Sequence, residues 1–266
     1  AAGTVSEYRI ERRTGGSAFA LLRTVPGTAT SSNDTGLTPS TAYDYRVQAC
    51  NAGGCSAFSG EASATTHPAT SDAPDNLTAT TVSSSRIDLS WGAAAGTVTG
   101  YEIERRTGAG AFSLVTTVAG TTYQDDGLAA ATNYTYRVRA CNAGGCSEYS
   151  NEASATTLSA APGIPGDLTA TTASSSRIDL SWTASTGTVS GYVIERRTGA
   201  GAYTVVDTVS GVTAFQNDGL AAATAYTYRV QACNAGGCSE FSGEASATTQ
   251  PNPPGSPSAT TVSSTA

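Results

Sequence analysis

Six cysteines are the residues of this chain best suited to chemistry. They occur as three identical pairs, each inside a copy of the stretch ACNAGGCS, at 49–56, 140–147 and 232–239. Two thiols separated by four residues could ligate a metal ion, form a redox centre or join in a disulfide. The elements that position the two sulfurs decide between these chemistries.

A metal site or a redox centre needs neighbours that these stretches lack. A zinc site takes about four ligands, and each stretch offers two cysteines. His67 is the only histidine and lies in a proline-containing segment outside the stretches. A thioredoxin-like centre has two residues between its cysteines and a helix start beside them. We therefore expect no metal, no cofactor and one disulfide per stretch, joining Cys50 to Cys55, Cys141 to Cys146 and Cys233 to Cys238.

The surrounding sequence is an internal repeat. Trp91 and Trp182 are 91 residues apart, and GYEIERRTGAGAF at 100–112 matches GYVIERRTGAGAY at 191–203 and, more loosely, EYRIERRTGGSAF at 7–19. A period of this length is too long for a solenoid unit and fits a small independent domain. The chain thus contains tandem copies of one domain.

Each copy consists of short segments in which apolar and polar residues alternate. RIDLSW at 86–91 places Ile87, Leu89 and Trp91 on one face, which is the period of a half-buried strand. Trp91 and its counterpart Trp182 are the expected core tryptophans. Turns occur every 8–12 residues and no segment has helical periodicity. This pattern predicts an all-β fold of seven-stranded sandwiches.

The strand pattern also places the cysteines. YTYRVRAC at 134–141 alternates so that Cys141 points away from the face of Tyr136 and Val138. The following NAGG predicts a hairpin loop, because glycine accepts the positive φ that tight turns need. A disulfide across this hairpin closes a loop of about six residues and contributes roughly 2 kcal/mol at most. We expect it to pin the loop outside the core.

These residues carry a family resemblance. The early tryptophan in RIDLSW, the YTYRVRA strand and a recurring Leu–Tyr spacing resemble a fibronectin type III domain over nearly the whole chain. The resemblance implies immunoglobulin-like sandwiches with a tyrosine corner, in which a Tyr hydroxyl ties a loop to the sandwich. The implied corner pairs are Leu37 with Tyr43, Leu128 with Tyr134, and Leu220 with Tyr226.

Alignment of the copies predicts the domain boundaries. Repeat 1 (1–67) is incomplete and lacks its first two strands, repeat 2 (73–157) and repeat 3 (164–249) are complete, and 254–266 is an orphan first strand of a further domain. Short Pro-rich linkers, HPATSDAP, APGIPG and QPNPPGSP, separate them. Such linkers are semi-rigid and space domains along a line.

Composition excludes several classes of partner. The net charge is −7, and all 14 basic residues are Arg. An acidic chain without a basic stripe is not expected to bind nucleic acid. No run of 18 apolar residues occurs, so no membrane span is expected. Paired cysteines are typical of an oxidising compartment, which predicts an extracellular or cell-surface location.

Other polar and aromatic groups have ordinary explanations. The three Glu-Arg-Arg triplets, at 11–13, 104–106 and 195–197, could bind an anionic glycan, but cross-strand ion pairs on a solvated face are favoured. Phe58, Tyr149 and Phe241 share one repeated position and are expected to pack inward. No lone nucleophile or phosphate loop is present, so we expect no enzyme activity and no catalytic residue.

One acidic pair could recruit a metal ion. Asp125 and Asp126 are adjacent, but the alignment of the copies places them opposite Asn33-Asp34 and Asn217-Asp218, so the pair is not repeated. Because Asn and Asp are common turn residues, a turn role is favoured.

These features suggest two functions. The first is a structural, non-catalytic extracellular protein, the repeating unit of a surface fibre. In it, copies of the chain assemble head to tail, and the orphan strand of one copy fills the open sandwich of the next. The alternative, suggested by the family resemblance, is a set of spacer or accessory carbohydrate-binding modules from a secreted polysaccharide hydrolase, with polysaccharide as the partner.

Overall fold

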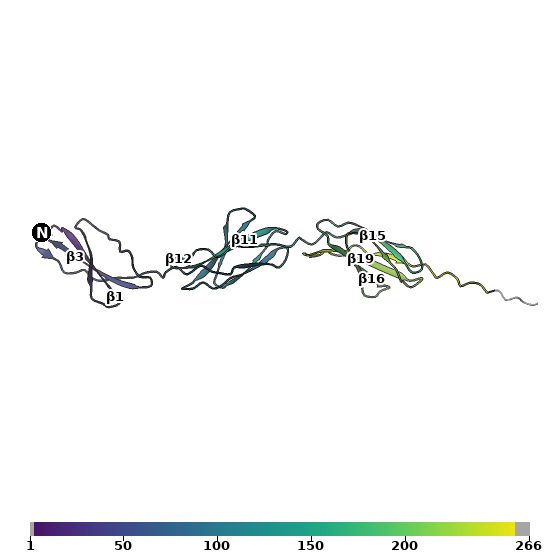
Figure 1. The fold of residues 1–266 in the computed structure, drawn as a ribbon, viewed down its shortest axis with the longest axis horizontal. Coiled ribbons are helices and arrows are strands. Elements are labelled where there is room, and N and C mark those ends of the chain that lie inside the picture. Colours follow the sequence, from purple (N-terminus) through teal and green to yellow (C-terminus); the bar gives the residue numbers. More distant parts are fainter. Residues whose placement is uncertain (1–2, 259–266) are drawn as a thin grey trace, which may run out of the picture. The chain divides into compact units, whose positions relative to one another are not determined.

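The computed structural model describes residues 3–258, and every regular element in that range is a β-strand (Figure 1). None of these residues forms a helix long and apolar enough to cross a membrane. The orphan strand predicted at 254–266 falls mostly on residues that are not described, and residues 254–258 are not in a strand.

Repeat 3 shows the complete arrangement. Its strands are β14 (Gly166–Thr172), β15 (Ile178–Thr183), β16 (Gly191–Thr198), β17 (Thr204–Val209), β18 (Ala214–Asn217), β19 (Ala225–Asn234), β20 (Gly237–Cys238) and β21 (Ala245–Thr248). One sheet has the order β14-β15-β18 and the other the order β17-β16-β19-β20, with β21 also paired to β19. All six strand pairs of these two sheets are antiparallel.

The two sheets of repeat 3 enclose one hydrophobic core. Alternation directs Ile178, Leu180 and Trp182 of β15 toward Ile194 of β16 and Val230 of β19. Ile194 and Val230 are completely buried, and Trp182 is 5% exposed. Complete burial of such a side chain stabilises the fold by roughly 1.5–3 kcal/mol relative to exposure. The period-2 pattern of the sequence is therefore the direct cause of the two-layer fold.

Repeat 2 has the same strand order. Its strands are β6 (Thr78–Thr81), β7 (Arg86–Ser90), β8 (Gly100–Thr107), β9 (Ser113–Val118), β10 (Thr122–Asp126), β11 (Asn133–Asn142), β12 (Gly145–Cys146) and β13 (Ala153–Thr156). The sheets are β10-β7-β6 and β12-β11-β8-β9, with β13 paired to β11. Trp91 is buried and meets the ring of Tyr101 edge-on, with ring centroids 5.6 Å apart.

In repeats 2 and 3 the seventh strand is broken into two pieces. The two-residue strands β12 and β20 hold the second cysteine, and six residues separate each of them from the next strand, β13 or β21. Both pieces pair with the same neighbour, β11 or β19. The residues between them do not continue the alternation of a strand, which affects the prediction for Tyr149 below.

Repeat 1 contains one sheet among its described residues. Its strands are β1 (Glu7–Thr14), β2 (Ala20–Pro26), β3 (Ala42–Asn51), β4 (Gly54–Cys55) and β5 (Ala62–Thr65), in the order β2-β1-β3-β4, with β5 paired to β3. Ile10 and Val47, the counterparts of Ile194 and Val230, are only half-buried. They line an open groove of about 540 Å³ on this sheet.

Candidate functional site

The six cysteines form three disulfides, each across the hairpin predicted for it. Cys141 at the end of β11 and Cys146 in β12 are direct cross-strand partners, with Cα atoms 4.0 Å apart. The pairs Cys50–Cys55 and Cys233–Cys238 have the same geometry. A disulfide offers no thiolate to a metal or a substrate.

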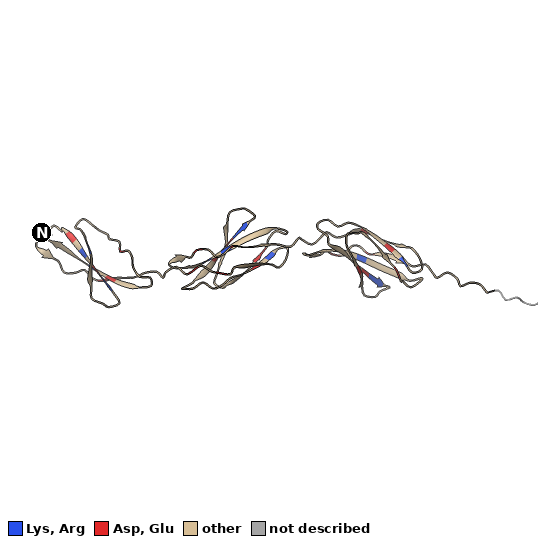
Figure 2. Cartoon of the chain, in the orientation of Figure 1, with Lys and Arg blue, Asp and Glu red and all other residues tan. Residues whose placement is uncertain are grey.

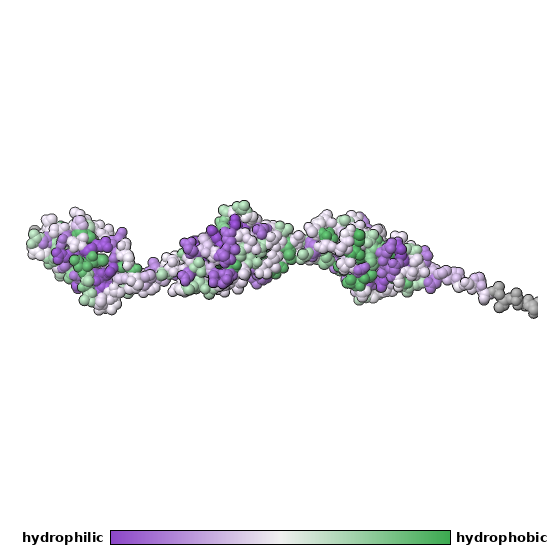
Figure 3. All heavy atoms as spheres, in the orientation of Figure 1, coloured by the Kyte–Doolittle hydropathy of each residue, from purple (hydrophilic) through white to green (hydrophobic). Residues whose placement is uncertain are grey.

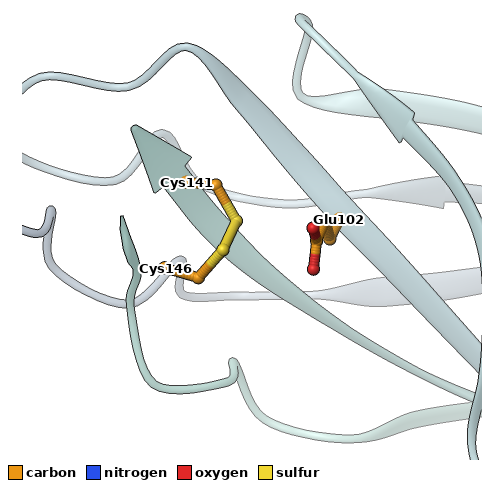
Figure 4. A group of neighbouring side chains, drawn as sticks. All are labelled: Glu102, Cys141 and Cys146. Atoms are coloured by element: carbon orange, nitrogen blue, oxygen red, sulfur yellow. A yellow bond between two sulfur atoms is a disulfide. The ribbon is translucent and has the colours of Figure 1, made fainter. Parts of the chain in front are cut away.

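One carboxylate lies beside these sulfurs in repeat 2. Figure 4 shows Glu102 next to the disulfide of Cys141 and Cys146, and the three side chains are close enough to suggest a metal site. However, Glu102 is ion-paired with Arg139 at 2.7 Å. Arg9 and Val193 occupy the equivalent position in the other repeats. The arrangement is therefore an ion pair beside a covalent staple, not a set of metal ligands.

The outer face of the five-stranded sheet carries a stack of arginine and aromatic side chains. In repeat 2 the guanidinium of Arg137 lies 4.1 Å from the ring centre of Phe112 and 3.8 Å from that of Tyr149. Arg106 lies on Phe112 at 4.9 Å, and Arg139 on Tyr149 at 5.0 Å. We call this alternating stack the arginine ladder. Each such contact contributes about 0.5–1 kcal/mol at exposed sites.

The arginine ladder recurs in each repeat. Its members are Arg13, Phe19, Arg46 and Phe58 in repeat 1, and Arg197, Tyr203, Arg229 and Phe241 in repeat 3. In both, the central arginine lies 3.8–4.1 Å from the centres of two rings. Threefold repetition indicates that the stack is a property of the domain and not of one surface.

The expectation that Phe58, Tyr149 and Phe241 pack inward is wrong. All three rings are half-buried on the outer face, against arginine. The broken seventh strand is the reason, because serine side chains take part in the hydrogen bonds that hold its middle section to the neighbouring strand, in place of regular strand pairing. The hydroxyls of Ser147 and Ser150 accept hydrogen bonds from the backbone N–H groups of Ala140 and Val138.

Cross-strand ion pairs fix the position of the central arginine in each arginine ladder. Arg137 donates to Glu104 at 2.8 and 2.6 Å across β11 and β8, and Tyr149 donates its hydroxyl to the same carboxylate at 2.7 Å. Burial acts to raise the pKa of Glu104, but the hydrogen bonds from Tyr149 and Arg137 outweigh it, so this pKa lies below its usual value. The cross-strand ion pairs expected for the Glu-Arg-Arg triplets are present. Figure 2 marks the acidic and basic positions along the chain.

The tyrosine-corner residues lie near the start of β3, β11 and β19, at the end of each strand opposite to its cysteine. The hydroxyl of Tyr43 accepts a hydrogen bond from Thr38 N–H at 2.9 Å, and that of Tyr226 accepts one from Ala221 N–H at 3.0 Å. Tyr134 is buried at the equivalent position. The leucines of the pairs are buried in two repeats, Leu128 and Leu220, and half-buried at Leu37 in repeat 1.

Sequence reasoning missed one buried polar position. Asp34 accepts hydrogen bonds from Arg12 and from the hydroxyl of Tyr45, and Asn217 accepts the same pair of bonds from Arg196 and Tyr228. Both stand three residues before the corner leucine. That shared distance is the signal that could have found them.

Asp125 occupies the same position in repeat 2. It lies three residues before Leu128 and is 3% exposed, at the end of β10. It is thus the counterpart of Asp34 and Asn217, and the alignment that placed it opposite Asn33 is wrong by one residue. The position is better described as a buried hydrogen-bond acceptor than as a turn residue or a metal ligand.

Comparison with known proteins identifies the fold family. The model of the fibronectin type III domain matches residues 1–65, 72–156 and 163–248. The chain belongs to the fibronectin type III family. The all-β tandem architecture predicted from the repeats is thereby confirmed. Fibronectin type III domains are non-catalytic modules.

Several relatives with fibronectin type III similarity are bacterial enzymes. The chain is 38% identical to Exoglucanase B of Cellulomonas fimi over 84% of its own length, and 35% identical to Endoglucanase B of the same organism over 86%. It is 37% identical to Chitinase A1 of Niallia circulans over 62%. It spans 22%, 23% and 24% of these relatives, so it corresponds to less than a quarter of each.

A solved structure has a weaker likeness. The fibronectin type III domains FN1–FN3 of chicken CNTN1 superpose with a TM-score of 0.48 at 23% identity, covering 92% of this chain and 90% of that one.

The aromatic side chains of these fibronectin type III domains are all buried or half-buried. The chain has 12 Tyr, 5 Phe and 2 Trp, all within the described residues, and none of them is exposed. The half-buried rings of the arginine ladder lie against guanidinium groups. Leu21, Leu114 and Val205, on the edge strands, are exposed aliphatic residues. Figure 3 shows green areas beside purple ones in repeats 1 and 3.

Proposed function

We propose that these three repeats are a non-catalytic spacer within a longer secreted polysaccharide-degrading enzyme. The relatives support this proposal, because an exoglucanase, an endoglucanase and a chitinase each contain a region similar to this chain and three quarters or more that is not. They favour the spacer over the surface fibre, for which self-assembly has no support among them. An extracellular location belongs to the same proposal, and the three disulfides agree with it.

One observation carries the choice of spacer over carbohydrate-binding module. Sugar-binding sites present flat aromatic rings to solvent so that a pyranose ring can lie on them. In this chain no aromatic residue is exposed, and the half-buried rings of the arginine ladder already have arginine on their faces. The domains therefore offer stability and length and no sugar platform.

Two measurements test the spacer. In a sedimentation assay with microcrystalline cellulose and with chitin, the chain should stay in the supernatant; retention that a soluble oligosaccharide competes away would contradict the spacer and support a binding module. The reading frame around the coding sequence should contain a catalytic domain. A frame made of fibronectin type III repeats alone would contradict the proposal.

Oligomeric state separates the spacer from the fibre. A spacer should sediment as a monomer in analytical ultracentrifugation over a wide range of concentrations. Concentration-dependent end-to-end assembly, abolished by deletion of residues 252–266, would instead support strand sharing into the open groove of repeat 1.

A further inference from the structure

The linker between repeats 2 and 3, taken here as residues 158–163, is tied to repeat 2 by its first residue. Leu158 donates its N–H to the carbonyl of Ser83 at 3.1 Å and accepts from the N–H of Ala131 at 2.9 Å. Ala131 has a φ of 49°, a left-handed conformation that alanine adopts only at an energetic cost. The strained residue supplies the N–H group that bonds to the linker, so the strain occurs at the point of attachment.

The other repeats have an equivalent hydrogen bond, donated by a residue with positive φ, where the chain leaves them. Ser40, with a φ of 50°, donates to the carbonyl of His67 at 3.1 Å. Ala223, with a φ of 49°, donates to the carbonyl of Gln250 at 3.1 Å. Each repeat thus holds a residue at the point where the chain leaves it: His67, Leu158 or Gln250.

The disulfide-closed loop of the next repeat holds the other end of the linker. Asn234, directly after Cys233, donates its side-chain amide to the carbonyl of Ala160 in the linker at 2.6 Å and to the carbonyl of Thr188 at 2.8 Å. Its side-chain oxygen accepts from the N–H of Gly236 at 2.7 Å. A side-chain amide can make four hydrogen bonds, and here three serve to fix the loop and the linker together.

Asn142 does the same for the linker between repeats 1 and 2. It donates to the carbonyl of Ala69 at 2.7 Å and to that of Thr97 at 2.8 Å, and it accepts from Gly144 N–H at 2.7 Å. The loop residues that carry these bonds lie between two cysteines that are joined to each other.

A glycine in each of these loops makes room for the linker. A Cβ on Gly236 would lie 1.8 Å from the carbonyl oxygen of Ser159, and one on Gly144 would lie 1.9 Å from that of Pro68. In repeat 1, whose loop bonds to no linker among the described residues, a Cβ on Gly53 would meet only the side chain of Asn51, at 3.2 Å. The close approach in repeats 2 and 3 is therefore made by the linker and not by the loop itself.

We propose that the disulfide-closed loop is a docking site for the linker that enters its own repeat, and that this docking stiffens the joint between repeats. Leu158 is bonded to repeat 2 and Ala160 to repeat 3, so Ser159 alone separates the two attachment points. The occupant is a backbone segment, recognised by the side-chain amide of an asparagine and accommodated by a glycine that has no Cβ at the point of close approach. The inference rests on the spacer function proposed above and gives that function a mechanism.

The disulfide has a defined part in this device. Cys233 and Cys238 bracket the asparagine and the glycine, so the bond between the sulfurs holds both contacts in the geometry that receives the linker. Reduction should therefore loosen the joint before it unfolds the sandwich, because the core residues of β19 lie on the opposite face of the strand.

The first experiment compares two asparagine variants of the full chain. Asn142→Ala combined with Asn234→Ala removes the amide from both occupied loops, and Asn51→Ala is the matched control in the loop without a linker. Cleavage by a protease of broad specificity, mapped by mass spectrometry, should become roughly tenfold faster within 67–72 and 158–163 in the double variant, because cleavage follows the population of the opened segment. Small-angle scattering should show a broader distribution of dimensions for the double variant than for the control.

The second experiment tests the close approach without changing a polar group. Gly236→Ala should speed cleavage within 158–163 to a similar extent, whereas Gly53→Ala should have no effect on any linker. Thermal unfolding of each variant checks that the sandwiches remain folded; if a variant of repeat 3 fails to fold, reduction of the wild-type disulfides provides the same test.

The outcomes separate this inference from the spacer function. Equal cleavage and equal scattering for all variants would overturn the docking site and leave the spacer in place. Binding of the wild-type chain to cellulose or chitin would overturn the spacer, while a faster linker cleavage in the double variant would still support the docking site.

Discussion

Arg229 donates two hydrogen bonds to one carboxylate oxygen of Glu195, at 2.8 and 2.6 Å, across the neighbouring strands β19 and β16. The same guanidinium lies between the rings of Tyr203 and Phe241. One side chain on the outer face thus connects two strands, a loop and the broken seventh strand. The outer face of each sandwich is ordered in this way by charge and aromatic contacts, as the inner face is by apolar burial.

Removal of this arginine should destabilise repeat 3. In Arg229→Met the apolar stem remains, but the bond to Glu195 and the cover on two rings are lost, which should lower the free energy of unfolding by about 2 kcal/mol. Hydrogen–deuterium exchange of β16 and β19 amides measures the loss for this repeat alone. Arg9→Met is the control, because Arg9 is 46% exposed and its pair with Glu7 should contribute less than about 0.5 kcal/mol. Equal losses would show that the ladder adds nothing.

Acid should weaken repeat 1 through Asp34. Burial acts to raise the pKa of Asp34, but hydrogen bonds from Arg12 and Tyr45 outweigh it and hold this pKa below its usual value. A depressed pKa gives stability that is present above the unfolded value, about 4, and is lost as the pH falls through the folded value. Calorimetry between about pH 5 and pH 2 should show a steeper loss for the wild type than for Asp34→Asn.

The converse substitution in repeat 3 provides the control. Asn217 accepts the same two bonds but carries no charge that titrates. Asn217→Asp should therefore give repeat 3 the acid sensitivity of repeat 1. If both variants keep the pH profile of the wild type, the Arg12–Asp34 pair has no part in acid stability.

Alkali should act on repeat 3 through Tyr228. Desolvation by burial, with little opposition from Arg196, raises the pKa of Tyr228 to about 12. A raised pKa gives stability that is complete below the unfolded value, about 10, and is lost as the pH rises through the folded value. The absorbance of tyrosinate should show one residue that ionises near pH 12, and this step should be absent in Tyr228→Phe. Its persistence in the variant would assign the step to another tyrosine.

The disulfides should contribute modestly to global stability. Replacement of Cys233 and Cys238 by serine opens a loop closed by residues five apart in sequence, and the loss should be about 2 kcal/mol. Urea unfolding followed by tryptophan fluorescence measures it, and the reduced wild type should show at least the same loss. A loss near 5 kcal/mol would mean that the loop supports the core and not only the hairpin.

The tyrosine corner should contribute through one hydrogen bond. Tyr226→Phe leaves the ring in place and removes the acceptor of Ala221 N–H, which should cost about 1 kcal/mol. Tyr43→Phe should cost a similar amount in repeat 1, because Thr38 N–H bonds to that hydroxyl at 2.9 Å. Calorimetric unfolding of both variants provides the test; no change in either would reduce the corner to a packing contact.

The sequence was sufficient to predict which face of a single strand each side chain occupies. The alternation of β11 placed Tyr136 and Val138 in the core and Cys141 outside it, as the structure shows. The inward position expected for Tyr149 was wrong because it assumed an unbroken strand, and the hydroxyls of Ser147 and Ser150 replace that strand. No local sequence pattern shows that a backbone N–H donates its hydrogen bond to a side-chain hydroxyl.

The amino-acid sequence by itself determined the repeats, the all-β class and the pairing of the sulfurs, because periodicity and residue type act at short range along the chain. Tertiary structure alone decided which groups meet across strands: Arg137 with Phe112 and Tyr149, Asp34 with Tyr45, and Asn234 with the carbonyl of Ala160. These contacts join residues that are distant in sequence, and the geometry of a hydrogen bond or a ring contact exists only once the sheets have brought them together.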